Sequence, residues 1–399
     1  MKQFPDFINQ YLNNFTELDS YQKFVSHLNE GKDFSVSGLN SSSTALLLYN
    51  IFLKQNNNFL VIFSDESSAE KFRDDLDYFF NKDNTGFLPK LENSVNSEHV
   101  SEVDSFFYND VKNKLLDNQN YIYVATPSVK NIKFPSRETN NKNELLVETG
   151  MTFNREELID TIYRYGFERV DKTTFPKDYS IRASIVDLFI PGYSYPYRIE
   201  FFGDTIESIR KFDPETQRTI TTLNQFNLYP LSSSDLIVEN ESNIFDLLNN
   251  KNSTIIFFDK ENIDIADFNN IASFQKIYRY KLLSKGINFP VHEISIDKKT
   301  VSGLKTFINH NLKKSTTFLL FSSKEKQVDR LRSIFNDYHI HIQNGNFTSS
   351  FYFKNIDTYF ISENDVLSHS YRTKFKNKRL PSDIDVQDTD AGSSVSVSS

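Results

Sequence analysis

The stretch SGLNSSSTALLL, residues 37–48, has the setting of a phosphate-binding loop, because a short apolar strand precedes it and a helical pattern follows it. A nucleotide-binding P-loop reads G-x-x-x-x-G-K-[ST]: backbone amides and the lysine hold the phosphates, and the hydroxyl binds Mg²⁺. Gly38 takes the first glycine position, but Ser43 replaces the second glycine, Thr44 the lysine and Ala45 the hydroxyl residue. The stretch therefore lacks the side chains that ATP hydrolysis needs.

Two interpretations of this stretch remain open from its residues alone: an eroded P-loop, or a serine-rich helix start that never bound a nucleotide. Both predict that the chain does not hydrolyse ATP, although helix N-terminal amides could still hold an anion weakly. Other catalytic motifs are not found, since the sequence has no Cys, no G-x-S-x-G and no H-E-x-x-H. His339 and His341 point the same way on a strand-like run, but no third ligand is evident, so we expect no metal site.

The composition predicts a globular protein of two or three domains. Of 399 residues, 38% are hydrophobic and 15% aromatic, which is ample material for packed cores. The net charge of −8 argues against a sequence-independent DNA clamp. No apolar run reaches the roughly 18 residues of a membrane span. We expect a cytoplasmic location, with which the lack of Cys is compatible.

Strands alternate with helices in the first section of the chain, and this order predicts a parallel α/β sheet. NFLVIFSD (58–65) and NYIYVATP (120–127) are typical of buried strands, and each is accompanied by a helical pattern. The same alternation returns toward the C-terminal end, in 253–262, 316–337 and 355–367.

The middle section differs, because one helix is followed by several strand-like runs. Residues 154–166 predict a helix that Asn154 caps and that ends before Gly166. The strand-like runs are 179–190, 195–202 and 205–213. Gly203 and Asp204 form a tight link between the last two runs, which favours an α+β module built on an antiparallel meander.

Apolar and charged residues alternate within these runs, so each run has two distinct faces. The residues predicted to face one way are Ile181, Ala183, Ile185, Tyr197, Ile199 and Phe201. Those predicted to face the other way are Arg182, Ser184, Arg198 and Glu200. If the apolar set packs on the 154–166 helix, then Arg182, Arg198 and Glu200 form a charged platform on a rigid sheet. A merely solvated sheet face is the alternative that the residues leave open.

Residues 166–220 contain, in order, GFERVD, RASIVDLFIP, RIEFFGDTIESIRKFD and TQR. This series resembles the UvrA-interaction domain shared by UvrB and the transcription-repair coupling factors (Mfd). The matching residues are Gly166, Arg169, Val170, Asp171, Arg182, Asp187, Phe189, Arg198, Glu200, Phe202, Gly203, Asp204, Ile206, Arg210, Asp213, Gln217 and Arg218. Two departures stand out: Ala183 replaces the usual glycine, and Ile190 separates Phe189 from Pro191.

The resemblance implies a degenerate helicase-like (RecA/P-loop-type) α/β domain into which the interaction domain is inserted, followed by a small α/β domain. The implied ranges are 1–133 and 229–288 for the helicase-like domain, 134–228 for the interaction domain, 289–378 for the third domain and 379–399 for a disordered acidic tail. The resemblance also identifies Gly38, Ser43, Thr44 and Ala45 as an eroded Walker A motif. Asp259 is then the remnant of the second nucleotide motif, and Lys260 beside it would oppose Mg²⁺. We therefore expect no bound ATP and no cofactor.

The partner that the resemblance implies is UvrA, bound by the sheet face with Arg182, Arg198 and Glu200 and helped by Arg169 and Phe189. The implied function is a non-catalytic module that recruits nucleotide excision repair to stalled transcription. DNA contact would be indirect, and RNA polymerase is not an expected partner, because the sequence lacks the family's motor motifs and polymerase-binding region. Two alternatives stay open: a UvrB-like DNA-dependent ATPase, and a non-functional fragment of a disrupted gene.

Overall fold

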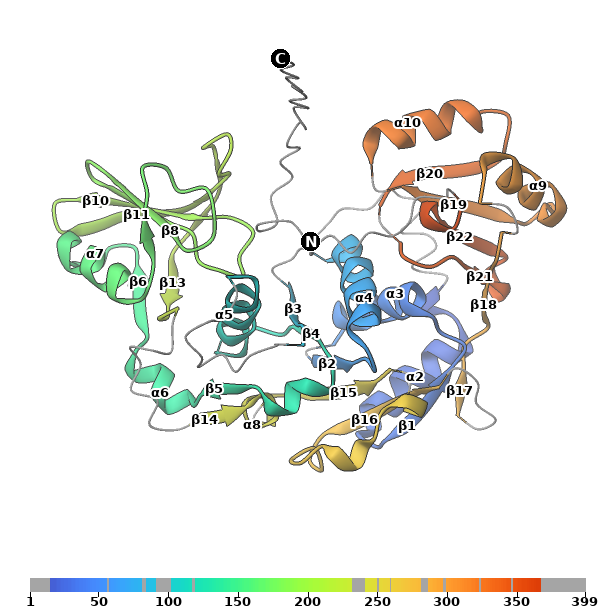
Figure 1. The fold of residues 1–399 in the computed structure, drawn as a ribbon, viewed down its shortest axis with the longest axis horizontal. Helices are drawn as coiled ribbons and strands as arrows, with labels where there is room; N and C mark the ends of the chain where they lie inside the picture. The colour runs from blue at the N-terminus through green and yellow to red at the C-terminus, as the bar shows by residue number, and fades with distance from the viewer. Residues whose placement is uncertain are drawn as a thin grey trace, which may run out of the picture.

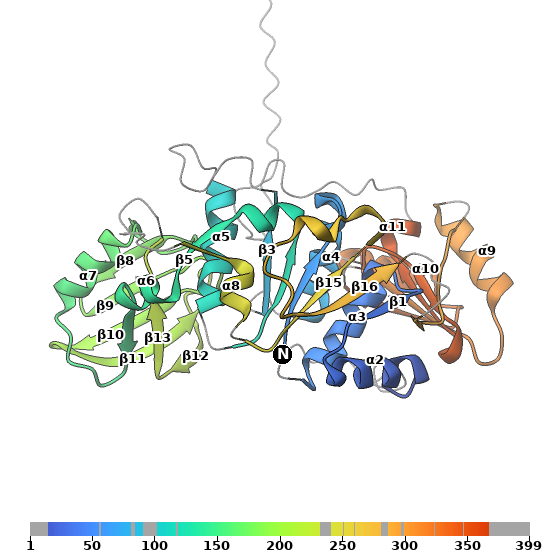
Figure 2. The same cartoon turned by 90° about the horizontal axis from the view of Figure 1, so that it is seen from below.

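The computed structural model describes residues 15–366 except 56, 81–83, 91–101, 117–118, 232–240, 250, 259, 281–285, 297–298, 323 and 346. Asp259 and the tail predicted at 379–399 lie outside these residues. The described chain forms three modules side by side in a row, with the central sheet between the other two (Figures 1 and 2). Within it, no helix is long and apolar enough to cross a membrane.

The central module is a parallel sheet of seven described strands in the order β17-β1-β16-β15-β2-β4-β3. Its strands are β1 (Phe34–Ser37), β2 (Asn58–Ile62), β3 (Thr85–Leu88), β4 (Ile122–Ala125), β15 (Ser253–Phe257), β16 (Gln275–Tyr280) and β17 (Ile287–Asn288). Its helices are α2 (Asp19–Glu30), α3 (Ser41–Phe52), α4 (Glu66–Phe79), α5 (Glu102–Leu116) and α8 (Ile244–Asn249). All neighbouring strands in this sheet are parallel, which confirms the predicted sheet type. The sheet combines strands from both sides of a long insertion.

Strand β2 shows why this sheet is buried on both faces. All five of its residues are buried, as in other parallel sheets that are covered by helices on each side. Phe59 and Val61 point into a core shared with α3 and α4. Leu60 and Ile62 point into a second core shared with α5 and α8.

The inserted module contains an antiparallel meander in the order β12-β11-β10-β9-β8, to which β7 adds a parallel edge. Its elements are β6 (Leu145–Glu148), α7 (Arg155–Arg164), β7 (Glu168–Arg169), β8 (Asp178–Arg182), β9 (Ile185–Leu188), β10 (Tyr197–Phe202), β11 (Thr205–Phe212), β12 (Thr219–Leu223) and β13 (Gln225–Leu228). Strands β6 and β13 pair antiparallel at its base. Asn154 caps α7 and Gly166 follows it with φ 87°, as predicted.

One prediction in this module was wrong: residues 179–190 are not a single strand. The chain reverses at Ala183 and Ser184, so β8 and β9 form a hairpin. Ala183 has φ 45°, the left-handed conformation that glycine adopts most easily. The reversal pairs Ile185 with Arg182, so Ile185 lies on the same side as Arg182 and not with Ile181.

The third module is a mixed sheet in the order β18-β21-β22-β19-β20. Its strands are β18 (Val291–Glu293), β19 (Thr317–Ser322), β20 (Ile340–Asn344), β21 (Phe351–Phe353) and β22 (Thr358–Ser362), and its helices are α9 (Val301–Asn311), α10 (Glu325–Ile334) and α11 (Glu363–Val366). One face has its own core, while Phe321, Phe347 and Phe360 on the other side join the core of the central module.

The connection between the central and inserted modules also contains β5 (Lys133–Pro135), α6 (Arg137–Lys142) and β14 (Glu241–Asn243), with β5 and β14 paired antiparallel. Helix α5 lies at this junction (Figure 1). Lys112 is buried on it, and its Nζ donates to Pro230 O and to Asn109 Oδ1. Burial lowers the pKa of Lys112 to about 7. The Asn113 amide donates to Pro191 O at 3.4 Å, so the turn at the extra residue Ile190 is tied to the central module.

Candidate partner-binding surface

The meander has an apolar inner face and a polar outer face. Tyr179, Val186, Ile199 and Ile209 pack with Leu158 and Ile162 of α7 on the inner face. We use "outer face" for the opposite side, on which the pairings place Arg182, Asp187, Arg198, Glu200, Ser208 and Arg210. The prediction that Arg182, Arg198 and Glu200 share one face is therefore confirmed.

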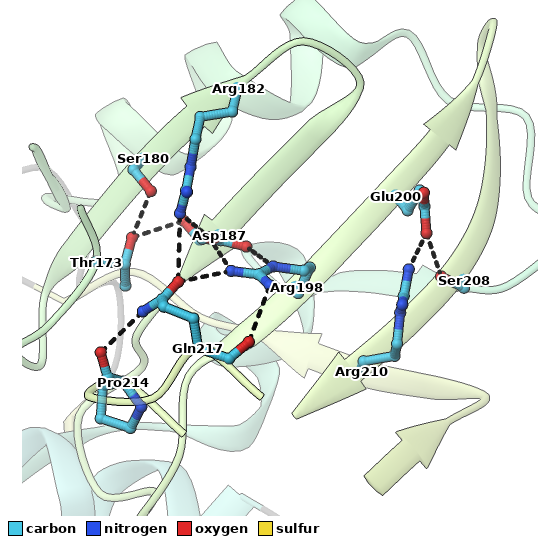
Figure 3. A network of polar contacts seen from close by, with 10 residues as sticks. All are labelled: Thr173, Ser180, Arg182, Asp187, Arg198, Glu200, Ser208, Arg210, Pro214 and Gln217. Carbon is cyan, nitrogen blue, oxygen red and sulfur yellow. Dashed lines mark hydrogen bonds and ion pairs between the residues drawn. The ribbon is translucent and has the colours of Figure 1, made fainter. Parts of the chain in front are cut away.

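Asp187 is the centre of the outer face (Figure 3). Its carboxylate accepts hydrogen bonds from Arg198 Nε at 2.7 Å and Arg198 Nη2 at 2.8 Å, a bidentate ion pair. Arg182 Nη2 donates to the same carboxylate at 3.0 Å. The Asp187 side chain is only 1% exposed, so two arginines, from the strands on either side of β9, are fixed on one buried charge.

Gln217 holds the same two arginines from the other side (Figure 3). Its Oε1 accepts from Arg198 Nη2 at 2.9 Å and from Arg182 Nη2 at 3.4 Å, while its Nε2 donates to Pro214 O. The loop is shaped by Asp213, whose carboxylate accepts from the amides of Glu215 and Thr216. Hydrogen bonds from Thr216 hold the pKa of Asp213 below its usual value.

The two arginines differ in exposure and in the number of hydrogen-bond donors that remain available to a partner protein. Arg198 is 15% exposed, and its Cζ atom lies 4.2 Å from the centroid of the Phe212 ring. All three of its guanidinium nitrogens donate hydrogen bonds within the chain. Arg182 is 51% exposed and uses only Nη2 among the described residues. Two arginines on one aspartate leave a net positive charge, and Arg182 presents it to solvent with Nε and Nη1 available as donors.

Glu200 lies beside this cluster but belongs to a separate ion pair. Its carboxylate accepts from Arg210 Nη2 and from Ser208 Oγ at 3.2 Å. Both charged side chains of this pair are about one-third exposed. The outer face therefore combines a net positive cluster with a neutral pair next to it.

Phe202 adds an exposed aromatic ring to the same face. It follows Glu200 by two positions on β10, so both point outward, whereas Phe201 is buried in the module core. Phe202 is 79% exposed, the largest exposed fraction among the large hydrophobic side chains of the described residues. The predicted site did not include it, nor Asp187 and Gln217; the strand period, applied to Phe202, would have indicated its outward direction.

The structure separates Arg169 and Phe189 from the other predicted contacts. Arg169 lies on edge strand β7, paired with Tyr179 of the inner face. Burial raises the pKa of Tyr179, and the charge of Arg169 opposes that rise, so the two groups are close. Phe189 is 5% exposed, so its side chain cannot contact a partner in this arrangement.

Gly38, Ser43, Thr44 and Ala45, which the sequence predicts to be an eroded nucleotide motif and which we call the remnant nucleotide site, lie between β1 and the first turns of α3. Helix α3 begins at Ser41, where Asn40 caps it by accepting from Ser43 N. Ser43, Thr44 and Ala45 are all buried, and both hydroxyls donate to Asn40 O. The fifth predicted residue, Asp259, lies outside the described residues.

Comparison with known proteins identifies the class of the inserted module. Residues 145–233 match the family model of the UvrB interaction domain. Together with the split parallel sheet, this match defines a helicase-like α/β fold with an inserted UvrB interaction domain.

The chain is similar to two kinds of repair protein. It is 27% identical to the transcription-repair-coupling factor of Bacillus subtilis over 228 residues, which cover 56% of this chain and 19% of that protein. Identity to the transcription-repair-coupling factor of Myxococcus xanthus is 42% over 84 residues, 21% of this chain and 7% of that protein. UvrABC system protein B of Gloeothece citriformis is 24% identical over 233 residues, 57% of this chain and 34% of that protein. The matched region thus spans only a minor part of the length of these relatives.

Proposed function

We propose that this chain binds UvrA through the outer face and takes part in nucleotide excision repair coupled to transcription. The observation that carries this proposal is the state of Arg182 in the matched interaction domain. Asp187 and Gln217 fix one nitrogen of its guanidinium, while the side chain is 51% exposed and Nε and Nη1 make no bond to a described residue. A fixed arginine loses little entropy when it donates to a partner carboxylate, and charge-assisted hydrogen bonds are the stronger ones.

We assign different roles to the residues of this face. Arg182 and Phe202 are the contact residues, since arginine and aromatic side chains supply most binding hot spots. Arg198, Asp187 and Gln217 are positioning residues, because their polar groups are used within the chain. The net positive charge favours an acidic patch on UvrA and speeds the encounter with it.

We further propose that the chain does not hydrolyse ATP. A P-loop needs a lysine that reaches the phosphates, and the residue in that position is Thr44, whose hydroxyl donates to Asn40 O at 2.7 Å. The UvrB-like ATPase alternative requires turnover of Mg-ATP, with or without DNA, above that of a buffer blank. We expect no such turnover, and a DNA-stimulated rate would establish that alternative instead.

The test is complex formation with UvrA in the absence of nucleotide, followed by gel filtration. We expect a complex, and we expect UvrB to displace this chain from UvrA because both would use the same kind of interaction domain. The control is the Arg182→Glu variant, checked for folding by circular dichroism. A folded wild-type chain that forms no complex would contradict the proposal and favour a non-functional fragment.

A further inference from the structure

Asn288 and Phe289, which lie just before the third module begins at β18, contact the turn at Gly38 in the remnant nucleotide site. Gly38 follows β1 with φ 79°, and Phe289 N donates to Ser37 O at 3.0 Å. A Cβ atom on Gly38 would lie 2.1 Å from Phe289 O and 2.9 Å from Asn288 Oδ1. In a P-loop, the backbone at this turn faces phosphate groups. Here the space beside Gly38 is filled by the backbone of Phe289.

A second contact closes the start of α3, and its centre is the carboxyl group of Asp75 on α4. Ser41 Oγ donates to Asp75 Oδ2 at 2.5 Å, and Ser42 Oγ donates to Oδ1 at 2.9 Å. From the third module, Thr348 donates through its backbone N at 2.7 Å and through Oγ1 at 2.8 Å. Four donors from two modules therefore meet on one carboxyl group.

Neighbouring polar groups extend this contact on both sides of Asp75. Ser349 N donates to Ser42 Oγ at 3.1 Å, and the Asn40 amide donates to Ser350 O at 3.3 Å. Every one of these bonds joins residues that are about 300 positions apart in the chain. The segment 347–350 is thus fixed on the turn and first helical residues of the remnant nucleotide site.

The contact is bordered by aromatic side chains. Tyr78 and Phe79 of α4 pack on Phe347 with ring centroids 5.1 and 5.6 Å apart. Charged groups on the elements packed here include Asp365, which accepts from Ser350 N, Glu363, which accepts from Ser322 Oγ, and Lys71, Arg73, Asp74 and Asp77 of α4. Helix α3 contributes no charged residue. Burial raises the pKa of Asp75 to about 7, although the hydrogen bonds from Ser41, Thr348 and Ser42 lower it.

We propose that the remnant nucleotide site is now an internal docking site, which the carboxyl group of Asp75 and segment 347–350 of the same chain close together. A site that binds its own chain holds the third module on the central module without a ligand. This proposal does not depend on UvrA, because none of its residues lies in the inserted module.

The test is hydrogen exchange of the full-length chain, read at the amides of 347–350. The Asp75→Ala variant removes the acceptor shared by Ser41, Ser42 and Thr348, so we expect exchange in this segment to rise about tenfold or more. The control is Asp329→Ala, which removes an exposed carboxylate that pairs with Arg332 on α10 of the third module. Exchange in the control should stay close to that of the wild type, and Mg-ATP should leave the wild-type pattern unchanged.

Two results would overturn the proposal. One is equal exchange in Asp75→Ala and Asp329→Ala, since the Asp75 carboxyl group would then not hold the segment. The other is slower exchange of residues 38–45 when Mg-ATP is added to the wild type, because the turn would then still accept a nucleotide. If Asp75→Ala does not fold, Thr348→Ala removes only the Oγ1 bond and must still raise exchange in 347–350 for the proposal to stand.

Discussion

Asp187 and Asp75 are both buried carboxyl groups, but their surroundings differ. Asp187 is held by two guanidinium groups, one of which is half exposed and has unused donors. Asp75 is held by three hydroxyls and one backbone amide, all supplied from within the chain. The first arrangement presents charge to solvent, whereas the second satisfies its groups inside the protein. A polar cluster therefore indicates a binding surface only if donors or acceptors remain available at its edge.

Replacing Asp187, the carboxylate whose arginine partner is half exposed, should give the largest change in the free energy of unfolding. Asp187→Ala leaves the mostly buried Arg198 without its counter-charge, which typically costs about 3–5 kcal/mol. Urea unfolding followed by circular dichroism measures the loss. The control Glu207→Ala removes an exposed carboxylate from β11 and should stay within about 0.5 kcal/mol. A loss no larger than that of the control would show that the ion pairs are not formed in solution.

The buried carboxyl group of Asp75 should make the free energy of unfolding depend on pH. The pKa of Asp75 rises from 3.8 to about 7 in the folded chain, so the folded state binds this proton more tightly than the unfolded state. Its contribution is then fully present below about pH 4 and is lost as the pH approaches about 7. Relative to Asp75→Asn, which does not titrate, the wild type should lose up to about 4 kcal/mol of unfolding free energy over this range.

Urea unfolding of both proteins at several pH values between about 4 and 8 measures this difference. Because the two chains share every other titratable group, their pH dependence should differ by the Asp75 contribution alone. Parallel curves across the whole range would mean that Asp75 is not enclosed as described.

Replacing Phe202 tests whether a single exposed side chain of the outer face contributes to UvrA binding. Phe202→Ala removes an exposed ring from the outer face, so we expect stability to be unchanged and UvrA binding to weaken about tenfold, or about 1.4 kcal/mol. The matched control is Tyr163→Ala on α7, where a ring that is 70% exposed lies on the other side of the module. Equal affinities of the two variants for UvrA would remove Phe202 from the contact surface.

Ala183 should give the smallest effect, and in the opposite direction. Ala183→Gly relieves the left-handed strain of the β8–β9 turn, which costs a non-glycine residue about 1–2 kcal/mol. The greater freedom of glycine in the unfolded chain offsets about 0.4–1 kcal/mol of this gain. We expect a net stabilisation of about 0.5 kcal/mol by urea unfolding, and a destabilised variant would contradict the turn geometry.

The period of the strands made part of the candidate site predictable. Arg198 and Glu200 were placed correctly because side chains alternate strictly along β10. The hairpin at Ala183 was missed because alanine gives no turn signal where glycine would. Ile185 was consequently assigned to the wrong face.

The features that could not be predicted from the sequence depend on contacts between residues far apart in the chain. Nothing local connects Asp75 with Thr348, which is 273 positions away, so the closure of the remnant nucleotide site had no sequence signal. Asp187 and Gln217 were recognised as pattern residues, but their positioning role depends on a loop that folds back over the sheet. Arg169 was grouped with Arg182 because both are basic pattern residues, whereas the pairing of β7 places it beside Tyr179.

The central claim is that the outer face binds UvrA through Arg182, and calorimetric titration of UvrA without nucleotide tests it most directly. The Arg182→Glu variant should weaken binding about 30-fold or more, because a contact hot spot is worth about 2 kcal/mol and the reversed charge adds repulsion. Arg169→Glu changes the same charge in the same module but on the edge strand, so it should bind nearly as well as the wild type. Equal losses in the two variants would mean that only the overall charge matters, and an unaffected Arg182→Glu variant would contradict the account.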